Sequence, residues 1–149
     1  MPSRAEAIAA RVQVVLNGAT AAGANVFRDR ADAFSREESP AILIELVDED
    51  STPLGGGRPG LAADQDVDVL RLAVITCVRG ASWQSVADGV RVQAHALLVA
   101  DSTLRGLVAS LRRDRCEWKA ASADQPFGYA AQIYAAKYAT RAHALDQPA

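Results

Sequence analysis

The sequence predicts an α+β fold: a mostly antiparallel sheet of about five strands with two main helices packed on one face. Two segments, residues 3–23 and 83–100, repeat their apolar positions with the spacing of a helix. Several others alternate apolar and polar residues, which is typical of strands with one buried face. The strands follow one another as a meander, and this order with two helices favours helices gathered on one side. The 149 residues match the usual size of a single domain, residues 1–149.

Each element of the first part of the chain has its own local signal. The first helix begins with Ser3 followed by Glu6, a capping-box pattern, and Gly23 is expected to end it. Residues 25–30 predict a short edge strand, whose charged end discourages unwanted pairing. Residues 41–47, AILIELV, predict a stronger strand because branched apolar residues occupy both of its faces.

The most distinctive segment is residues 51–66, STPLGGGRPGLAADQD. Its glycine run and two prolines disfavour regular structure, and it is longer than most loops in compact domains. We therefore expect a flexible loop that becomes ordered only against a partner. Residues 67–78 then alternate as a long strand. Its outer part, residues 67–71, is expected to project beyond the sheet with the loop at its tip.

The second half opens with a helix over residues 83–100, with Ser82 as its expected N-cap. Gly89 weakens this helix, so we expect it to mark a close packing contact. The remaining predicted elements are a short helix over residues 104–111, a charged connector over 112–115, a strand over 116–121, a last long strand over 129–141 and a mobile tail over 143–149.

Composition argues against several classes of function. The 16 basic and 18 acidic residues give a net charge of −2, which disfavours a dedicated nucleic-acid binder because counterion release needs a surplus of cations. Two cysteines and two histidines are too few for a disulfide framework or a zinc site, and no apolar run reaches the length of a membrane span. The glycine run precedes no Lys-Ser or Lys-Thr pair, and neither histidine has a neighbouring nucleophile. We therefore expect neither enzyme activity nor a cofactor.

Two charged clusters leave alternatives open. Six acidic residues surround the long loop and could hold a divalent cation, but their spacing does not match a calcium loop, and a solvated acidic surface is favoured. The run Arg112-Arg113-Asp114-Arg115 could contact nucleic acid or an acidic partner. For this run a solvated connector with local ion pairs is the favoured interpretation.

Taken in order, the elements resemble the tail terminator family of long-tailed bacteriophages over almost the whole chain. The resemblance rests on the opening helix SRAEAIAARVQVVL, the VFRDR segment, the SPAILI run, the long strand VDVLRLAVITCVRG and the closing strand AAQIYAAKYATR. It also includes the ALLVAD end of the second helix and the STLRGL segment that follows. The family implies a small α+β protein that forms a hexameric ring on the end of the tail tube, stops tube polymerisation and presents a surface to the head-side neck. It has no catalytic motif to transfer.

The resemblance also implies partners and a location. The partners are further copies of the chain, the tail tube protein and a head-side neck or connector protein, at the head-proximal end of the tail of a virion assembled in the host bacterial cytoplasm. DNA is expected to pass through the ring without specific binding, and no membrane is involved. Cys77 and Cys116 are expected to remain free thiols in that compartment. A tail-completion or head-tail connector (neck) protein has similar size and elements and is the alternative.

Three regions are candidates for ring or partner contacts, because sheet edges and projecting arms suit interfaces between unlike surfaces. They are the long loop, the adjacent outer strand and the charged run. The candidate residues are Leu54, Gly55, Gly56, Gly57 and Arg58 in the loop, Val67, Val69 and Arg71 in the strand, and Arg112, Arg113 and Arg115 in the run.

Overall fold

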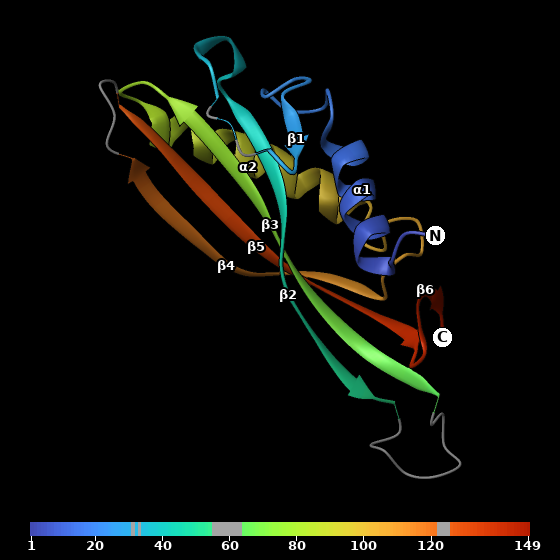
Figure 1. The fold of residues 1–149 in the computed structure, drawn as a ribbon. Coiled ribbons are helices and arrows are strands. Elements are labelled where there is room, and N and C mark those ends of the chain that lie inside the picture. Colours follow the sequence, from blue (N-terminus) through green and yellow to red (C-terminus); the bar gives the residue numbers. More distant parts are fainter. Residues whose placement is uncertain (31, 33, 55–63, 122–125) are drawn as a thin grey trace.

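A long, twisted sheet forms the body of the molecule, and two helices lie against one of its faces (Figure 1). The computed structural model describes residues 1–30, 32, 34–54, 64–121 and 126–149. Within these residues the elements are α1 (Arg4–Leu16), β1 (Val26–Arg28), the 3-10 helix η1 (Arg36–Glu38), β2 (Ala41–Pro53), β3 (Gln65–Arg79), α2 (Trp83–Ala100), β4 (Ser110–Ala121), β5 (Phe127–Arg141) and β6 (Ala144–Pro148).

The strand order of the sheet is β1-β2-β3-β5-β4, with β6 added beside β5. The central strands β3 and β5 pair without interruption, from Gln65 opposite Arg141 to Arg79 opposite Phe127. Of the described strand pairs, only β1 and β2 are parallel. The predicted α+β fold, a mostly antiparallel sheet with two main helices, is therefore confirmed, and β6 adds a sixth strand.

The main core lies between the helices and one face of the sheet. Leu70, Leu72 and Val74 alternate along β3 toward this face, and Tyr134 and Ala136 do the same on β5. Because successive strand residues point to opposite faces, this alternation gives the sheet one continuous apolar surface. The helices cover that surface with buried residues at helical spacing, which are Ile8, Ala9, Val12 and Leu16 of α1 and Val90, Ala94 and Leu98 of α2.

A glycine on β5 lets the start of α2 lie close against the sheet. A Cβ atom added at Gly128 would lie 2.5 Å from three ring carbons of Trp83, closer than real Cβ contacts allow. Trp83 lies in turn beside Trp118, with their ring centroids 6.4 Å apart. The close contact expected at Gly89 is wrong, because a Cβ atom there would meet nothing within 4 Å. The close approach therefore depends on the strand glycine and not on the helix glycine.

Two predicted helical segments differ from the structure because the backbone turns into the left-handed region. α1 ends at Leu16 and not at Gly23, and Gly18 follows soon after with a φ of 73°. The short helix predicted after α2 forms turns instead. There Leu104 and Arg105 have φ values of 48° and 57°, which a right-handed helix cannot accommodate.

The hairpin formed by β2 and β3 is longer than the sequence predicts. The first three residues of the expected loop, 51–66, continue β2 and its last two begin β3, so the ladder reaches Pro53 opposite Asp66. Backbone pairing with a long neighbouring strand holds these residues although their own sequence disfavours regular structure. The structure therefore corrects the predicted flexible loop, residues 51–66, at both of its ends, and residues 55–63 lie outside the described residues. With them lie the predicted contact residues Gly55, Gly56, Gly57 and Arg58.

The predicted charged connector is wrong, and the segment predicted as a mobile tail contains a strand. Residues 112–115 lie within β4, because an edge strand can leave several consecutive charged side chains in solvent without losing its ladder. The tail, residues 143–149, contains β6, which turns back onto β5 so that Pro148 lies opposite Thr140. Both segments are held by pairing with β5, which follows β4 in the chain and directly precedes β6.

The two cysteines lie on strands that β5 separates. Cys77 of β3 is in register with Tyr129, and Cys116 of β4 is in register with Gln132. Because Tyr129 and Gln132 are three residues apart on one strand, they point to opposite faces of the sheet, and so do the two thiols. This placement supports the prediction that both cysteines are free thiols.

We expect Cys116 to react with iodoacetamide faster than Cys77 in the folded protein at about pH 8. Burial raises the pKa of the Cys77 thiol to about 12, so it holds almost no thiolate there. Cys116 is only partly buried, and its pKa is raised mainly by that desolvation. Mass spectrometry of the alkylated peptides measures both rates, and Cys116→Ser is the control. Equal rates, or the absence of both thiols in denaturant without reductant, would contradict the expectation.

Candidate protein-interaction surface

The sheet face opposite the helices, called the outer face below, has no second layer over it in the described structure (Figure 1). Its centre is apolar, with Leu43, Ile75 and Ala131 side by side in one cross-strand row. In the next row, Ile133 lies between Ala73 and Arg115 and is only 4% exposed. Charged residues of β2 and β4 border this apolar centre. An apolar centre with a charged margin is the usual composition of a protein-protein contact surface.

The structure brings two of the predicted contact regions together on the outer face. Arg71 of β3 lies opposite Ala135 of β5, and Ala135 lies opposite Arg112 of β4, so both arginines stand in one row. The sequence alone gave no reason to expect these regions to meet. The predicted contact residues found on the outer face are Val67, Val69, Arg71, Arg112 and Arg115.

Two other predicted contact residues lie elsewhere. Arg113 is in register with Tyr134, so it belongs to the face that the helices cover. Leu54 follows β2 at the far end of the hairpin, where its backbone N–H donates to the carbonyl oxygen of Gln65 at 2.8 Å. The predicted contact residues that the structure describes therefore do not form one continuous patch.

Arg71 is the centre of a charge network on the outer face. Its Nη1 donates to Asp48 Oδ1 at 2.9 Å and to Asp50 Oδ2 at 3.0 Å, and its Nε lies 3.4 Å from Asp114 Oδ2. The hydrogen bonds to Asp48 and Asp50 raise the pKa of the guanidinium further above its usual value. Exposed pairs of this kind contribute little to stability. They fix the positions of the charges, while Arg112 makes no ion pair within the described residues.

Both long edges of the sheet are free in the part of the chain that the structure describes. β1 pairs with β2 only over residues 42–44, and residues 45–53 beyond it are all exposed. β4 pairs only with β5, and most of its side chains are exposed as well. Each free edge leaves backbone N–H and C=O groups available to a further strand.

The two edges carry opposite charge. The free part of β2 is acidic and contains no basic residue, whereas β4 has more basic than acidic residues. The acidic residues of β2 are Glu45, Asp48, Glu49 and Asp50, and the charged residues of β4 are Arg112, Arg113, Asp114, Arg115, Glu117 and Lys119.

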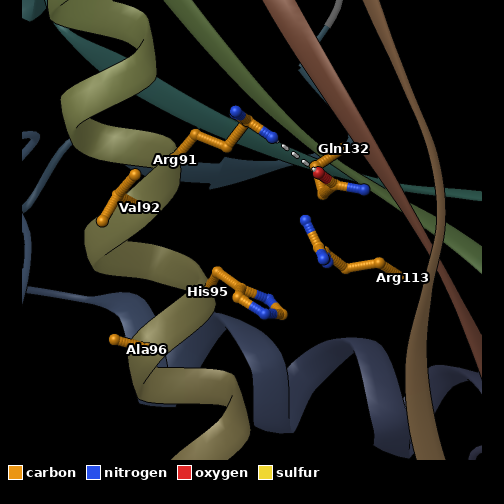
Figure 2. A pocket seen from close by; sticks show the side chains of 6 residues that line it. All are labelled: Arg91, Val92, His95, Ala96, Arg113 and Gln132. Atoms are coloured by element: carbon orange, nitrogen blue, oxygen red, sulfur yellow. Dashed lines mark hydrogen bonds between the residues drawn. The ribbon is translucent and has the colours of Figure 1, made fainter.

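A cleft under the β4 edge contains residues that the sequence analysis missed. Figure 2 shows Arg91 and His95 of α2 facing Arg113 of β4 and Gln132 of β5 around a cavity of about 240 Å³. The Arg91 Nη1 donates to Gln132 Oε1 at 3.2 Å, and His95 Nδ1 lies 2.9 Å from the Tyr134 hydroxyl oxygen. The spacing of one helical turn between Arg91 and His95 could have indicated that both lie on one face of the helix. The strand residues that they face, however, lie far away in the sequence.

Electrostatics in this cleft disfavour nucleophilic chemistry and favour an uncharged or acidic occupant. Desolvation first, and then the positive charges of Arg113 and Arg91, lower the pKa of His95 below its usual value, so the ring is neutral at pH 7. Desolvation raises the pKa of the nearby Cys116 thiol, which keeps it protonated and weakly nucleophilic. The cleft is therefore better suited to receiving a side chain than to activating a nucleophile.

Comparison with known proteins finds no family model that matches the chain and no match among curated proteins. Within the described residues, no group of three or more His, Cys, Asp or Glu side chains could hold a metal ion. None of the helices described has the length and apolar character to cross a membrane. The surfaces of the described structure that offer contacts to a partner are the outer face, the hairpin and the two sheet edges.

Proposed function

We propose that the protein is a tail terminator of a long-tailed bacteriophage: a subunit of a ring, expected to be hexameric, that caps the tail tube, ends its polymerisation and provides the surface for head joining. The observation that carries this proposal is the β2–β3 hairpin, whose far end extends past both helices (Figure 1). The strand β3 alone has 15 residues and spans roughly 50 Å at the usual strand rise. That length is the whole strand, and β3 pairs with β5 along all of it, so residues 67–71 lie within the sheet and do not project beyond it as the sequence predicts. The end of the sheet past the helices is the part placed to contact a neighbouring ring.

The task requires binding surfaces and no chemistry. A tube of identical rings leaves an open mating face after each addition, and a contact between unlike surfaces that does not close continues indefinitely. A terminator binds that face and presents a different surface on its other side. The hairpin with Val67 and Val69, and the apolar centre of the outer face, are candidate contacts for the tube protein.

The charge of the chain agrees with a ring around a DNA passage. A net charge of −2 supplies little counterion release on binding phosphates, so DNA is not held at the ring. The virion location and the neck partner follow from the same proposal.

Deletion of the gene from the phage that encodes it tests the role. Electron microscopy of the lysate should show headless tails of abnormal and variable length beside filled heads without tails. Tails of normal length that fail only at head joining would favour the neck-protein alternative. Normal infectious particles would contradict both functions.

Complementation of the deletion links the role to the hairpin. We expect the double variant Val67→Asp/Val69→Asp to fold but to leave tail length variable, because two carboxylates would stand on the contact surface of the hairpin. Val14→Asp is the matched control, since Val14 is an exposed valine on α1, away from the sheet. It should restore normal tails, and restoration by both variants would exclude this part of the hairpin as a tube contact.

A further inference from the structure

We infer that copies of this chain join head to tail through the two free sheet edges, with residues 45–50 of β2 in one copy running antiparallel to β4 of the next. The inference rests on the proposed ring function for its biological role, and it names the contact that would build the ring. The partner on each edge is a second copy of the chain.

Strand direction favours this pairing. Each neighbouring pair in the order β2-β3-β5-β4 is antiparallel, so β2 and β4 themselves run in opposite directions. A second copy placed beside the first in the same orientation brings its β2 next to β4 with antiparallel polarity. Antiparallel strands can then form a regular ladder between the copies.

The cross-strand register aligns opposite charges at this contact. One row of the outer face runs from Glu45 through Ala73 and Ile133 to Arg115. A second row runs from Asp48 through Arg71 and Ala135 to Arg112. Each row begins with a carboxylate on β2 and ends with an arginine on β4. If the rows continue into the next copy, Arg115 meets its Glu45 and Arg112 meets its Asp48.

The spacing of these charges matches on both edges because each edge strand has an irregularity at the same level. The β2 ladder shifts between Leu46 and Asp48, and the β4 ladder shifts between Arg113 and Arg115. Two charges on each strand are therefore three residues apart and still share the outer face. A regular strand would place residues three apart on opposite faces. The two edges thus share the same unusual spacing, which makes them complementary in register as well as in charge.

Exposed apolar residues stand where this contact would cover them. Leu46 and Val47 on the β2 edge are 42% and 46% exposed. The row of Leu46 continues through Leu72 and Tyr134 to Arg113, so the neighbour's Leu46 arrives at the cleft under β4. Val92 and Ala96 of α2 also contribute to the lining of that cleft.

The two joined surfaces differ from each other, which is the condition for a head-to-tail assembly. Contacts between unlike surfaces repeat from copy to copy and form a ring when the rotation between copies closes. The opposite charges of the edges also prevent either edge from pairing with its own kind, because like charges opposite each other are unfavourable across a ladder.

A charge swap at one pair of residues tests the contact. Glu45 makes no ion pair in the described part of the chain. Arg115 has one ion-pair contact there, with its Nη2 3.4 Å from Glu117 Oε1. The charges of both residues can therefore be reversed without disturbing the Arg71 network. Sedimentation velocity over a concentration series measures self-association. We expect Glu45→Arg and Arg115→Glu each to raise the dissociation constant at least about tenfold, and the chain with both changes to regain most of the lost affinity.

The control variant is Glu37→Arg, which changes the net charge by the same amount as Glu45→Arg. Glu37 is an exposed residue of η1, away from both edges. It should associate like the wild-type chain, and circular dichroism should show that all four variants fold. A wild-type chain that stays monomeric up to about 1 mM overturns the inference, and so does a double variant that associates no better than the single ones.

The outcomes separate this contact from the proposed function. Charge-dependent association together with normal particles from the gene deletion would overturn the tail-terminator function and leave the edge contact in place. Variable tail lengths together with association that ignores the charge swap would overturn the edge contact alone.

Discussion

Replacing Leu72 by alanine is expected to lower the free energy of unfolding by about 3 kcal/mol. Leu72 is fully buried at the centre of β3, in register with Leu46 on one side and Tyr134 on the other. Its side chain lies in the main core beneath both helices, so truncation leaves a cavity that the paired strands cannot easily close. Urea denaturation followed by circular dichroism measures the change, and the melting temperature should fall by about 10 °C.

The same substitution at an exposed leucine is the control. Leu145 of β6 is 63% exposed, and Leu145→Ala should change stability by no more than about 0.5 kcal/mol. A loss at Leu72 no larger than the loss at Leu145 would contradict the position of the core between the helices and this face of the sheet.

Two glycine-to-alanine substitutions are expected to change stability in opposite directions. Gly128→Ala should lower the free energy of unfolding by about 2 kcal/mol, because the new methyl group would overlap the Trp83 ring and push it from its place beside Trp118. Gly89→Ala should raise stability by up to about 1 kcal/mol, since alanine favours the helix and its methyl group has open space.

Thermal unfolding and near-ultraviolet circular dichroism check this pair of variants together. Trp83 and Trp118 are the two tryptophans of the chain, so a change in the dichroism of Gly128→Ala reports on their contact directly. The spectrum of Gly89→Ala should match that of the wild-type protein. Stabilisation of the protein by Gly128→Ala would contradict the packing of α2 on β5.

The elements that the sequence predicted well are those with one buried face. The helix over residues 83–100 has the predicted bounds, and the long strands around residues 41–47, 67–78 and 129–141 are present with added residues at their ends. In the helix and in the strands over residues 67–78 and 129–141, burial produces a period in the sequence that local inspection can detect, whereas residues 41–47 are marked by apolar residues on both faces. The prediction of two helices on a mostly antiparallel sheet follows from those periods.

The missed elements lack such a period. β4 is an edge strand with charged residues on both faces, so residues 112–115 show no alternation and their sequence indicates a connector. The turns at Leu104 and Arg105 depend on left-handed backbone angles, which neither residue type predicts. β6 forms because residues 144–148 turn back and pair with β5. These residues show no apolar alternation that would predict a strand.

The candidate interaction surface was even harder to predict from local sequence patterns than the missed elements. The sequence could mark Arg71 and Arg112 as exposed charges, but their meeting depends on β5 being inserted between β3 and β4. The cleft was missed for a similar reason, since Arg91 and His95 face residues from two strands that come later in the chain. Strand order and register are properties of the whole sheet, and a local pattern does not encode them.

The irregularities in β2 and β4 also bear on how the length of this chain can vary. Loss of Val47 or of Asp114 would leave a regular ladder with the flanking side chains on their present faces, whereas loss of one residue inside β3 or β5 would turn every later side chain of that strand to the wrong face. Under the head-to-tail contact, however, each bulge faces the bulge of a neighbour. If that contact forms, a chain that loses one of these residues is expected to keep the match between the two edges only by losing the other as well.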